Sequence, residues 1–191
     1  MPQKKDPRSR FTILDFVQFL GGVLALCCIL SYVFTGTSTW GYTGKYLNSQ
    51  YYKFVVQHQL ISHESILFTT DELALYNGTD TNLPIYVSVN GTVFDVSYGR
   101  DIYGPDHGRY HLFAGHDYSR VFVNGCFHRK DQWTFDLRGL DEKEAEIKLQ
   151  SWIKYYRKHP QYWEVGQLQL PNLNNQPIPE ECRDGLKLPS F

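Results

Sequence analysis

The sequence predicts an α+β domain that follows one N-terminal membrane-spanning helix. Three observations predict this arrangement: an uncharged apolar run near the N-terminus, a strand–turn–strand pattern in the middle of the chain, and a long amphipathic helix pattern after it. The 191 residues leave room for one domain of ordinary size and some additional segments. A formal net charge of −1 shows neither the basic excess of a nucleic-acid-binding protein nor a strongly acidic tail, so no nucleic-acid partner is predicted.

The apolar run extends from Phe16 to Phe34 and reads FVQFLGGVLALCCILSYVF. A helix of this length, rising 1.5 Å per residue, crosses roughly 30 Å of hydrocarbon. We place the membrane helix at residues 13–34, after a basic segment at residues 1–12. The alternatives are a buried core helix, which is usually shorter and amphipathic, and a cleavable signal peptide, which has a shorter apolar core followed by a small-residue cleavage site. A retained single-pass helix is the preferred interpretation.

Basic residues predict the orientation of this helix. Four precede the span and two follow it closely: Lys4, Lys5, Arg8, Arg10, Lys45 and Lys53. The positive-inside rule then leaves the N-terminus in the cytosol and places the domain in the lumen of the endoplasmic reticulum or another endomembrane compartment. Two glycosylation sequons, at Asn77 and Asn90, agree with a lumenal domain. In an oxidising lumen Cys126 and Cys182 can pair, whereas in the cytosol they would remain free thiols.

Residues 35–65 are predicted to be a juxtamembrane linker, in which Trp40, Tyr42 and Tyr46 suit the headgroup zone of a bilayer. The folded domain is placed at residues 66–170. It begins with a capping-box pattern at Thr69 and Glu72, which predicts a short helix.

The middle of the domain is predicted to contain a β-hairpin. Residues 85–89 and 92–96 are β-branched and aromatic runs joined by Asn90-Gly91, a strong signal for a two-residue turn. The stretch from Gly99 to Gly115 is predicted to be a loop with short helical pieces. An amphipathic helix is expected over residues 141–159, with one apolar face at i, i+3, i+4 and i+7 spacing that consists of Leu149, Trp152, Ile153 and Tyr156. A last strand is expected over 162–170 and an irregular tail over 171–191.

Signatures of catalysis are scarce, and the chain is not expected to be an enzyme. There is no Gly-rich phosphate loop, no G-x-S-x-G elbow and no H-E-x-x-H motif. His107 and His111 have the i, i+4 spacing of a helical metal pair, but Gly104, Pro105 and Gly108 disfavour a regular helix there. A zinc site is therefore disfavoured.

One stretch, from Tyr103 to Asp117, stands out and reads YGPDHGRYHLFAGHD. It resembles the membrane-associated progesterone receptor family, whose pattern is approximately Y-G-P-x-G-x-Y-x-x-F-A-G-x-D, with one extra residue in the loop. The resemblance extends to TDELALYNG at 70–78, VNGTVFDV at 89–96, Ser119-Arg120 and YWEVG at 162–166. It therefore covers most of the predicted domain. NGCF at 124–127 and DLRG at 136–139 resemble fungal members of the family.

This resemblance implies a cytochrome b5-like fold, a small mixed sheet with short helices around a haem cleft, and haem b as cofactor. Tyr110 matches the axial ligand, a tyrosinate on ferric haem iron. Tyr103 matches a second tyrosine that hydrogen-bonds near the ligand, and Tyr162 matches a tyrosine at the haem edge. Gln161 stands where the family often has Lys, which puts a salt bridge to a haem propionate in doubt, and His107 or Arg109 are alternatives for that role.

The implied function is that of a membrane-anchored haem-binding protein. A hard anionic oxygen ligand stabilises Fe(III) over Fe(II), which suits haem carriage, sensing or haem-dependent assembly better than general electron transfer. The resemblance implies support of membrane haem-thiolate monooxygenases, sterol metabolism or haem handling. The alternative is a haem-free adaptor that keeps the fold and binds a protein or a sterol in the same groove.

Overall fold

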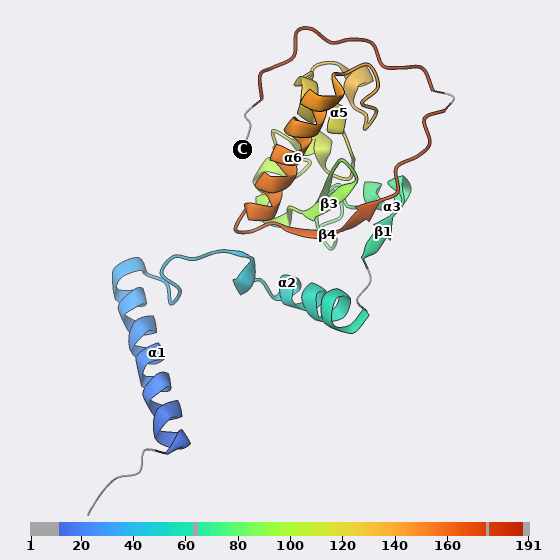
Figure 1. Ribbon diagram of the computed structural model, residues 1–191. Coiled ribbons are helices and arrows are strands. Elements are labelled where there is room, and N and C mark those ends of the chain that lie inside the picture. The colour runs from blue at the N-terminus through green and yellow to red at the C-terminus, as the bar shows by residue number, and fades with distance from the viewer. Residues whose placement is uncertain (1–11, 63–64, 175, 189–191) are drawn as a thin grey trace, which may run out of the picture. The chain divides into compact units, whose positions relative to one another are not determined.

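The computed structural model describes residues 12–62, 65–174 and 176–188 (Figure 1). The chain divides into two compact units, Met1–Thr43 and Gly44–Phe191. The boundaries assigned to the linker, the domain and the tail from the sequence remain predictions, while the elements inside them are described below. The basic segment predicted at residues 1–12 lies outside the described residues except for Thr12.

The first unit consists of α1, Ile13–Thr35, and a turn after it. Thr12 caps this helix in a capping box with Asp15, and Gly36 ends it in the left-handed conformation. The helix is long and apolar enough to cross a membrane. Ser31 is its one buried residue: its hydroxyl donates to the Thr37 carbonyl (2.6 Å) and accepts from the Trp40 amide (2.5 Å). The chain after the helix is thereby folded back onto its last turn.

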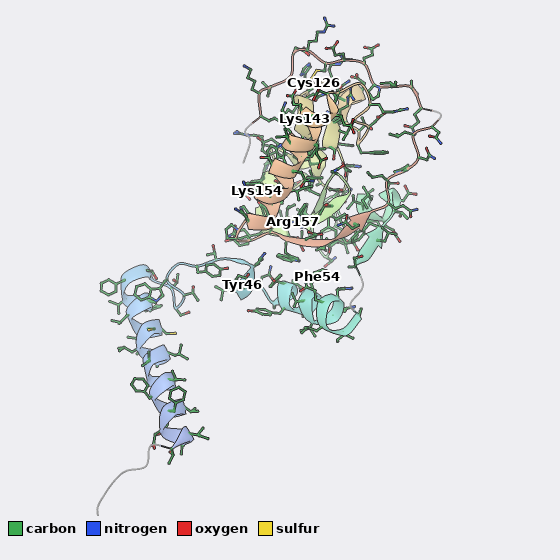
Figure 2. The ribbon with its side chains drawn as sticks, in the orientation of Figure 1. Tyr46, Phe54, Cys126, Lys143, Lys154 and Arg157 are labelled. Atoms are coloured by element: carbon green, nitrogen blue, oxygen red, sulfur yellow. A yellow bond between two sulfur atoms is a disulfide. The ribbon has the colours of Figure 1, made fainter. Side chains whose placement is uncertain are left out.

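The second unit begins with helical segments where the sequence predicted a linker. They are η1 Lys45–Leu47, α2 Ser49–Phe54 and a π-helical stretch, η2 Val55–Ser62. Side chains from one side of α2, Tyr51 and Phe54, pack against the core cluster on one face of the sheet. Figure 2 labels Phe54 on this helix. The Lys45 amide also donates to the Pro160 carbonyl (2.7 Å), so the domain fold includes residues well before position 66.

A four-stranded mixed sheet forms the centre of this unit, in the order β1-β4-β3-β2. Its strands are β1 Ile66–Phe68, β2 Tyr86–Val89, β3 Thr92–Asp95 and β4 Trp163–Leu168. The predicted hairpin is confirmed: β2 and β3 pair antiparallel, and Asn90 and Gly91 both have positive φ, as their type of turn requires. β1 runs parallel to β4, with Ile66 opposite Gly166, where a Cβ would collide with the Ile66 carbonyl.

The sheet is buried on both faces by different elements. One face, with Val87 and Phe94, packs against α4, α5 and α6, and the other, with Val93 and Trp163, packs against α2 and α3. The helices on these faces are α3 Thr70–Ala74, α4 Arg100–Tyr103, α5 Ser119–Asn124 and α6 Glu142–Lys158. Single turns of 3₁₀-helix connect them at Ser97–Gly99, His111–Phe113 and Lys130–Gln132.

Two helices carry the sequence signals that predicted them. Thr69 and Glu72 form the capping box of α3, with the Thr69 amide donating to the Glu72 carboxylate (2.8 Å). In α6, Asp141 is the N-cap, and Leu149, Ile153 and Tyr156 are buried at helical spacing. The α+β fold predicted from the sequence is thus present, with the short helical pieces between Gly99 and Gly115 also in place.

The described residues of the tail after β4 form no helix or strand, and Figure 1 shows this red segment running in an arc around the end of the domain at which α5 lies. Arg138 donates to the carbonyls of Leu173 and Gln176, and the Leu186 amide donates to the Gly125 carbonyl. A disulfide joins Cys126 to Cys182, with Cα atoms 6.6 Å apart. We call residues 176–188 the strap.

We expect Asp95 to make the domain more stable as the pH falls through about 6. Its side chain is buried at the end of β3, and burial raises its pKa to about 6 although Ser97 donates two hydrogen bonds to it. A raised carboxyl pKa means that the folded state holds the proton more tightly than the unfolded state, so ionisation above pH 6 destabilises the fold. Through this group the free energy of unfolding should rise by about 2 kcal/mol between pH 7 and pH 4.

Chemical denaturation of the full chain in detergent, at both pH values, measures this contribution as the difference between wild type and Asp95→Asn. The matched control is Asp80→Asn, because Asp80 also accepts an amide hydrogen bond two residues ahead but is exposed. If Asp95→Asn and Asp80→Asn change the pH dependence equally, burial of Asp95 is not its cause.

Candidate ligand-binding cleft

A cavity of about 190 Å³ lies on the face of the sheet that carries α4, α5 and α6. No charged side chain lines it. Its lining residues are all aromatic or aliphatic: Ile102, Tyr103, Tyr110, Phe113, Phe122, Phe127, Trp152, Tyr155, Tyr156 and Leu188. The cavity therefore favours a ligand with broad apolar faces, and its four tyrosine hydroxyls are the polar groups that could orient such a ligand.

Tyr103 ends α4 and is buried in the wall of this cavity. Its hydroxyl lies 3.0 Å from that of Tyr156 on α6. Burial raises the pKa of both phenols, and the neighbouring phenol raises that of Tyr103 further. Both therefore stay protonated at neutral pH. Each phenol carries one proton, and the hydrogen bond between the two hydroxyls uses one of these protons. The other hydroxyl proton can still be donated to a ligand.

Tyr110 follows the tight loop after α4, where its amide donates to the Ile102 carbonyl (2.9 Å). Its ring lies 6.1 Å from that of Phe127 and 6.2 Å from that of Phe113, both in the cavity lining. Unlike Tyr103 it is 39% exposed. The structure thus brings Tyr103 and Tyr110 to one cavity, with Tyr110 at its solvent side.

Tyr162 is buried beside the cavity and is not one of its lining residues. Its ring lies 6.2 Å from Tyr103, edge to face, and stacks on His159 at 3.7 Å. Burial raises the pKa of Tyr162 to about 12 and lowers that of His159, so both are neutral near pH 7. Gly99 makes room for this phenol, since a Cβ there would collide with the Tyr162 hydroxyl.

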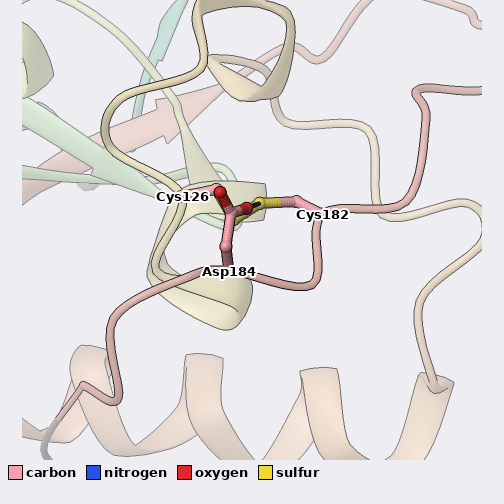
Figure 3. Close-up of side chains that lie close together, drawn as sticks. All are labelled: Cys126, Cys182 and Asp184. Atoms are coloured by element: carbon pink, nitrogen blue, oxygen red, sulfur yellow. Dashed lines mark hydrogen bonds between the residues drawn. A yellow bond between two sulfur atoms is a disulfide. The ribbon is translucent and has the colours of Figure 1, made fainter.

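The residues proposed for charged or metal contacts lie outside the lining. His107 and Arg109 are exposed, and His111 places its Nδ1 2.8 Å from the Gly108 carbonyl. The described residues that come together as possible metal ligands are instead Cys126, Cys182 and Asp184 (Figure 3). Both sulfurs of that group are in the disulfide, so neither is a thiolate that could bind a metal.

Sequence reasoning missed several parts of the cleft wall. The periodicity of α6 assigned Trp152 and Tyr156 to the core, and it did not single out Tyr155. These residues are part of both the core and the cavity wall. Leu188 gave no signal at all, because its position depends on how the strap docks.

The strap closes one side of the cleft through close backbone contacts. Gly185 lies against the Asn124 carbonyl and Gly125 lies against the Leu186 carbonyl, so closely that a Cβ at either glycine would collide. The disulfide between Cys126 and Cys182 fixes the strap at the same place (Figure 3). Leu188 is thereby held in the cavity lining.

The side chains that line this cavity suit a haem group, but the cavity is too small to hold one in this conformation. An aromatic wall, a partly exposed phenol and a protonated neighbour suit a flat macrocycle with a ferric iron. However, about 190 Å³ is below the roughly 300–1,000 Å³ of ordinary small-molecule pockets. A ligand of haem size therefore needs part of the wall to move. Among the lining residues, Leu188 lies nearest the C-terminus and in irregular structure, so we expect this part of the wall to move.

Comparison with family models decides the classification. Residues 69–168 match the model described as "Cytochrome b5-like Heme/Steroid binding domain". The chain belongs to this family. The matched range contains the whole hairpin, α3 to α6, Tyr103, Tyr110 and Tyr162, and it ends with β4.

Curated relatives place this cytochrome b5-like domain among membrane-associated and steroid-binding proteins. The chain is 44% identical over 112 residues to membrane-associated progesterone-binding protein 4 of Arabidopsis thaliana, covering 59% of this chain and 42% of that one. It is 36% identical over 107 residues to neuferricin of Danio rerio, covering 56% and 38%. The chain thus spans about two fifths of the length of these relatives. The names of several of these relatives describe binding of progesterone or of a steroid.

A solved structure, that of a putative steroid-binding protein from Arabidopsis, is 36% identical. The match covers 56% of this chain and 100% of that one, with a TM-score of 0.47.

We expect Arg120→Met to destabilise the cytochrome b5-like domain by about 3 kcal/mol or more. The Arg120 guanidinium is fully buried and donates to Gln132 and to the carbonyls of Asp136 and Arg138 at 2.7–3.0 Å. Without it these acceptors lose their donors inside the protein. The control is Arg157→Met, which removes an exposed ion pair with Glu164 and should change the free energy of unfolding by less than about 1 kcal/mol. Similar losses in both variants, measured by chemical denaturation, would contradict this role.

Proposed function

We propose that this protein is a membrane-anchored haem-binding protein in which Tyr110 is the axial ligand of ferric haem b. The single observation that supports this most directly is the presence of Tyr110 and the protonated Tyr103 in one uncharged aromatic cavity. The family match, whose description includes haem, supports the same proposal. The apolar helix α1 supports a single-pass anchor.

Differences among the cleft tyrosines favour Tyr110 as the ligand. An iron-bound tyrosine is a phenolate, so the residue must lose its proton. Burial raises the pKa of Tyr103, Tyr155 and Tyr156, which disfavours each of them as an anion. Tyr110 is the most exposed of the four. In this proposal Tyr103 keeps its proton and donates a hydrogen bond near the ligand oxygen. The ring of Tyr162 packs edge to face against that of Tyr103 and helps to hold it in this position.

Haem bound in this way would supply a low-potential ferric iron, because an anionic oxygen ligand stabilises Fe(III). The protein's own residues would bind the macrocycle between aromatic walls and keep water from its faces. This chemistry fits haem carriage, sensing or haem-dependent assembly, in support of membrane haem-thiolate monooxygenases or sterol metabolism. We do not assign an enzymatic activity of its own.

The absorption spectrum of the full chain in detergent, with added haem, tests the ligand. The wild type should show a ferric Soret band and a tyrosinate charge-transfer band, and Tyr110→Phe should lose the charge-transfer band and bind haem at least about tenfold more weakly. The matched control is Tyr98→Phe, which alters an exposed tyrosine outside the cavity and should leave the spectrum unchanged. A charge-transfer band that survives in Tyr110→Phe would assign the ligand elsewhere.

The second candidate function is binding of a sterol or protein without haem. It is favoured by the small apolar cavity and by the steroid-binding names among the relatives. A folded wild-type chain that stays colourless with haem, yet whose cleft tryptophan fluorescence changes with progesterone, would support this alternative.

We further propose that the domain lies in an oxidising lumen, with the N-terminus in the cytosol, in the endoplasmic reticulum or a related compartment. The Cys126–Cys182 disulfide supports this, because such bonds persist in oxidising compartments. We also propose that the chain is a fungal-type member, because the segments 124–127 and 136–139 resemble fungal members in sequence.

We expect release of the strap to speed haem entry. If haem binds only when Leu188 has left the cavity, the observed rate scales with the open fraction, so Cys182→Ser and Gly185→Ala should each raise it on the order of tenfold. Stopped-flow absorbance on the full chain measures this rate. The control replaces Cys27 and Cys28, the free cysteines of α1, with Ser and should leave the rate unchanged. Unchanged rates in both strap variants would show that haem enters elsewhere.

A further inference from the structure

The helical segment after the span has two apolar sides, and only one of them is covered. Tyr51 and Phe54 pack against the sheet. A second row, spaced by four residues, consists of Tyr52, Val56 and Leu60 and is 51%, 46% and 65% exposed. The adjoining Tyr46, Leu47 and Ile61 are also more than half exposed. We call these six exposed residues the apolar stripe.

Apolar residues gathered in this way are not expected on a helix that faces water. Such a helix normally presents charged or polar residues there. Between Tyr46 and Ser62 the only formally charged residue is Lys53. The chain contains no Asp or Glu between Asp15 and Glu64, although it has 20 acidic residues in total. The acid-free run therefore continues well beyond the end of α1 at Thr35 and covers the whole stripe.

Chain length keeps the stripe close to the membrane. Ser31, in the last turn of α1, binds the Trp40 amide, and the Lys45 amide binds Pro160 at the start of the second unit. The connection from Trp40 to Lys45 extends at most about 18 Å, at roughly 3.6 Å per residue. The headgroup zone itself is about 5–7 Å thick on each side of the bilayer. Tyr46 and Leu47 follow directly, so the segment starts no more than about 18 Å from the residues that pack on the end of α1, within reach of the headgroup zone.

We propose that the apolar stripe of Tyr46–Ser62 lies on the bilayer surface as an interfacial helix. The occupant of this surface is lipid: the stripe enters the boundary between headgroups and acyl chains, while Tyr51 and Phe54 hold the opposite side of the segment to the sheet. The tyrosines in its first half, Tyr46 and Tyr52, and the absence of carboxylates fit an interface that favours amphipathic rings and disfavours acidic groups. The domain is then attached to the membrane at two places and has a fixed face toward it.

Depth-dependent fluorescence quenching on the full chain in phosphatidylcholine vesicles tests this. In a background with Cys27→Ala and Cys28→Ala, the variant Leu60→Cys is labelled with an environment-sensitive fluorophore. The matched control is Ile147→Cys on α6, because Ile147 is apolar and 60% exposed but lies outside the stripe. A spin-labelled lipid should quench the probe at 60 at least about twofold more than the probe at 147, and aqueous iodide should show the reverse.

Two results would overturn the proposal. If lipid quenching is equal at both positions and iodide reaches both, the stripe faces water. If the probe at 60 is protected from iodide without being quenched by lipid, a protein surface covers the stripe instead. Val56→Cys serves as a second position, so that the outcome does not depend on one substitution. Unchanged thermal unfolding of each labelled variant confirms that the label has not displaced the helix.

Discussion

The buried guanidinium of Arg120 is the interaction on which the arrangement of the domain depends. It lies in α5 and donates to Gln132 and to the carbonyls of Asp136 and Arg138, and it approaches those of Pro179 and Glu180 at 3.3–3.4 Å. A fully buried charge is tolerated only when its hydrogen bonds are satisfied, so all these segments must meet at one point. This fixes α5, whose Phe122 forms a cleft wall, relative to the strap that carries Leu188.

The two faces of the sheet support different parts of the molecule. Phe94 and Val87 support the aromatic cleft, whereas Val93, their neighbour in β3, supports the face that α2 covers. Alternation of side chains along a strand makes this separation possible within a four-residue strand. A ligand in the cleft and a contact through the α2 segment would therefore lie on opposite faces of the same strands. The two could form at the same time, because they use different surfaces of the domain.

Local signals in the sequence predicted the elements with local causes. Asn90-Gly91 specified the hairpin turn, Thr69 and Glu72 specified the start of α3, and the spacing of Leu149 and Ile153 specified α6. The family resemblance supplied Tyr103 and Tyr110, which the structure brings to one cavity, while their roles and that of Tyr162 remain proposals. Long-range docking was not predictable: β1 is only three residues long, and the strap depends on distant partners such as Arg120.

The disulfide and the cleft are linked by the position of one segment rather than by direct contact. Cys182 fixes the strap to Cys126, which follows the C-cap of α5 at Gly125, and the same α5 provides Phe122 to the cavity. Loop closure by such a bond stabilises the fold by up to roughly 4 kcal/mol in the chain-entropy model, at a sequence separation of 56. The bond also limits how far Leu188 can move from the cavity. An oxidising compartment would therefore favour both a more stable domain and a more closed cleft, so that the rate of ligand entry depends on the freedom of the last residues of the strap.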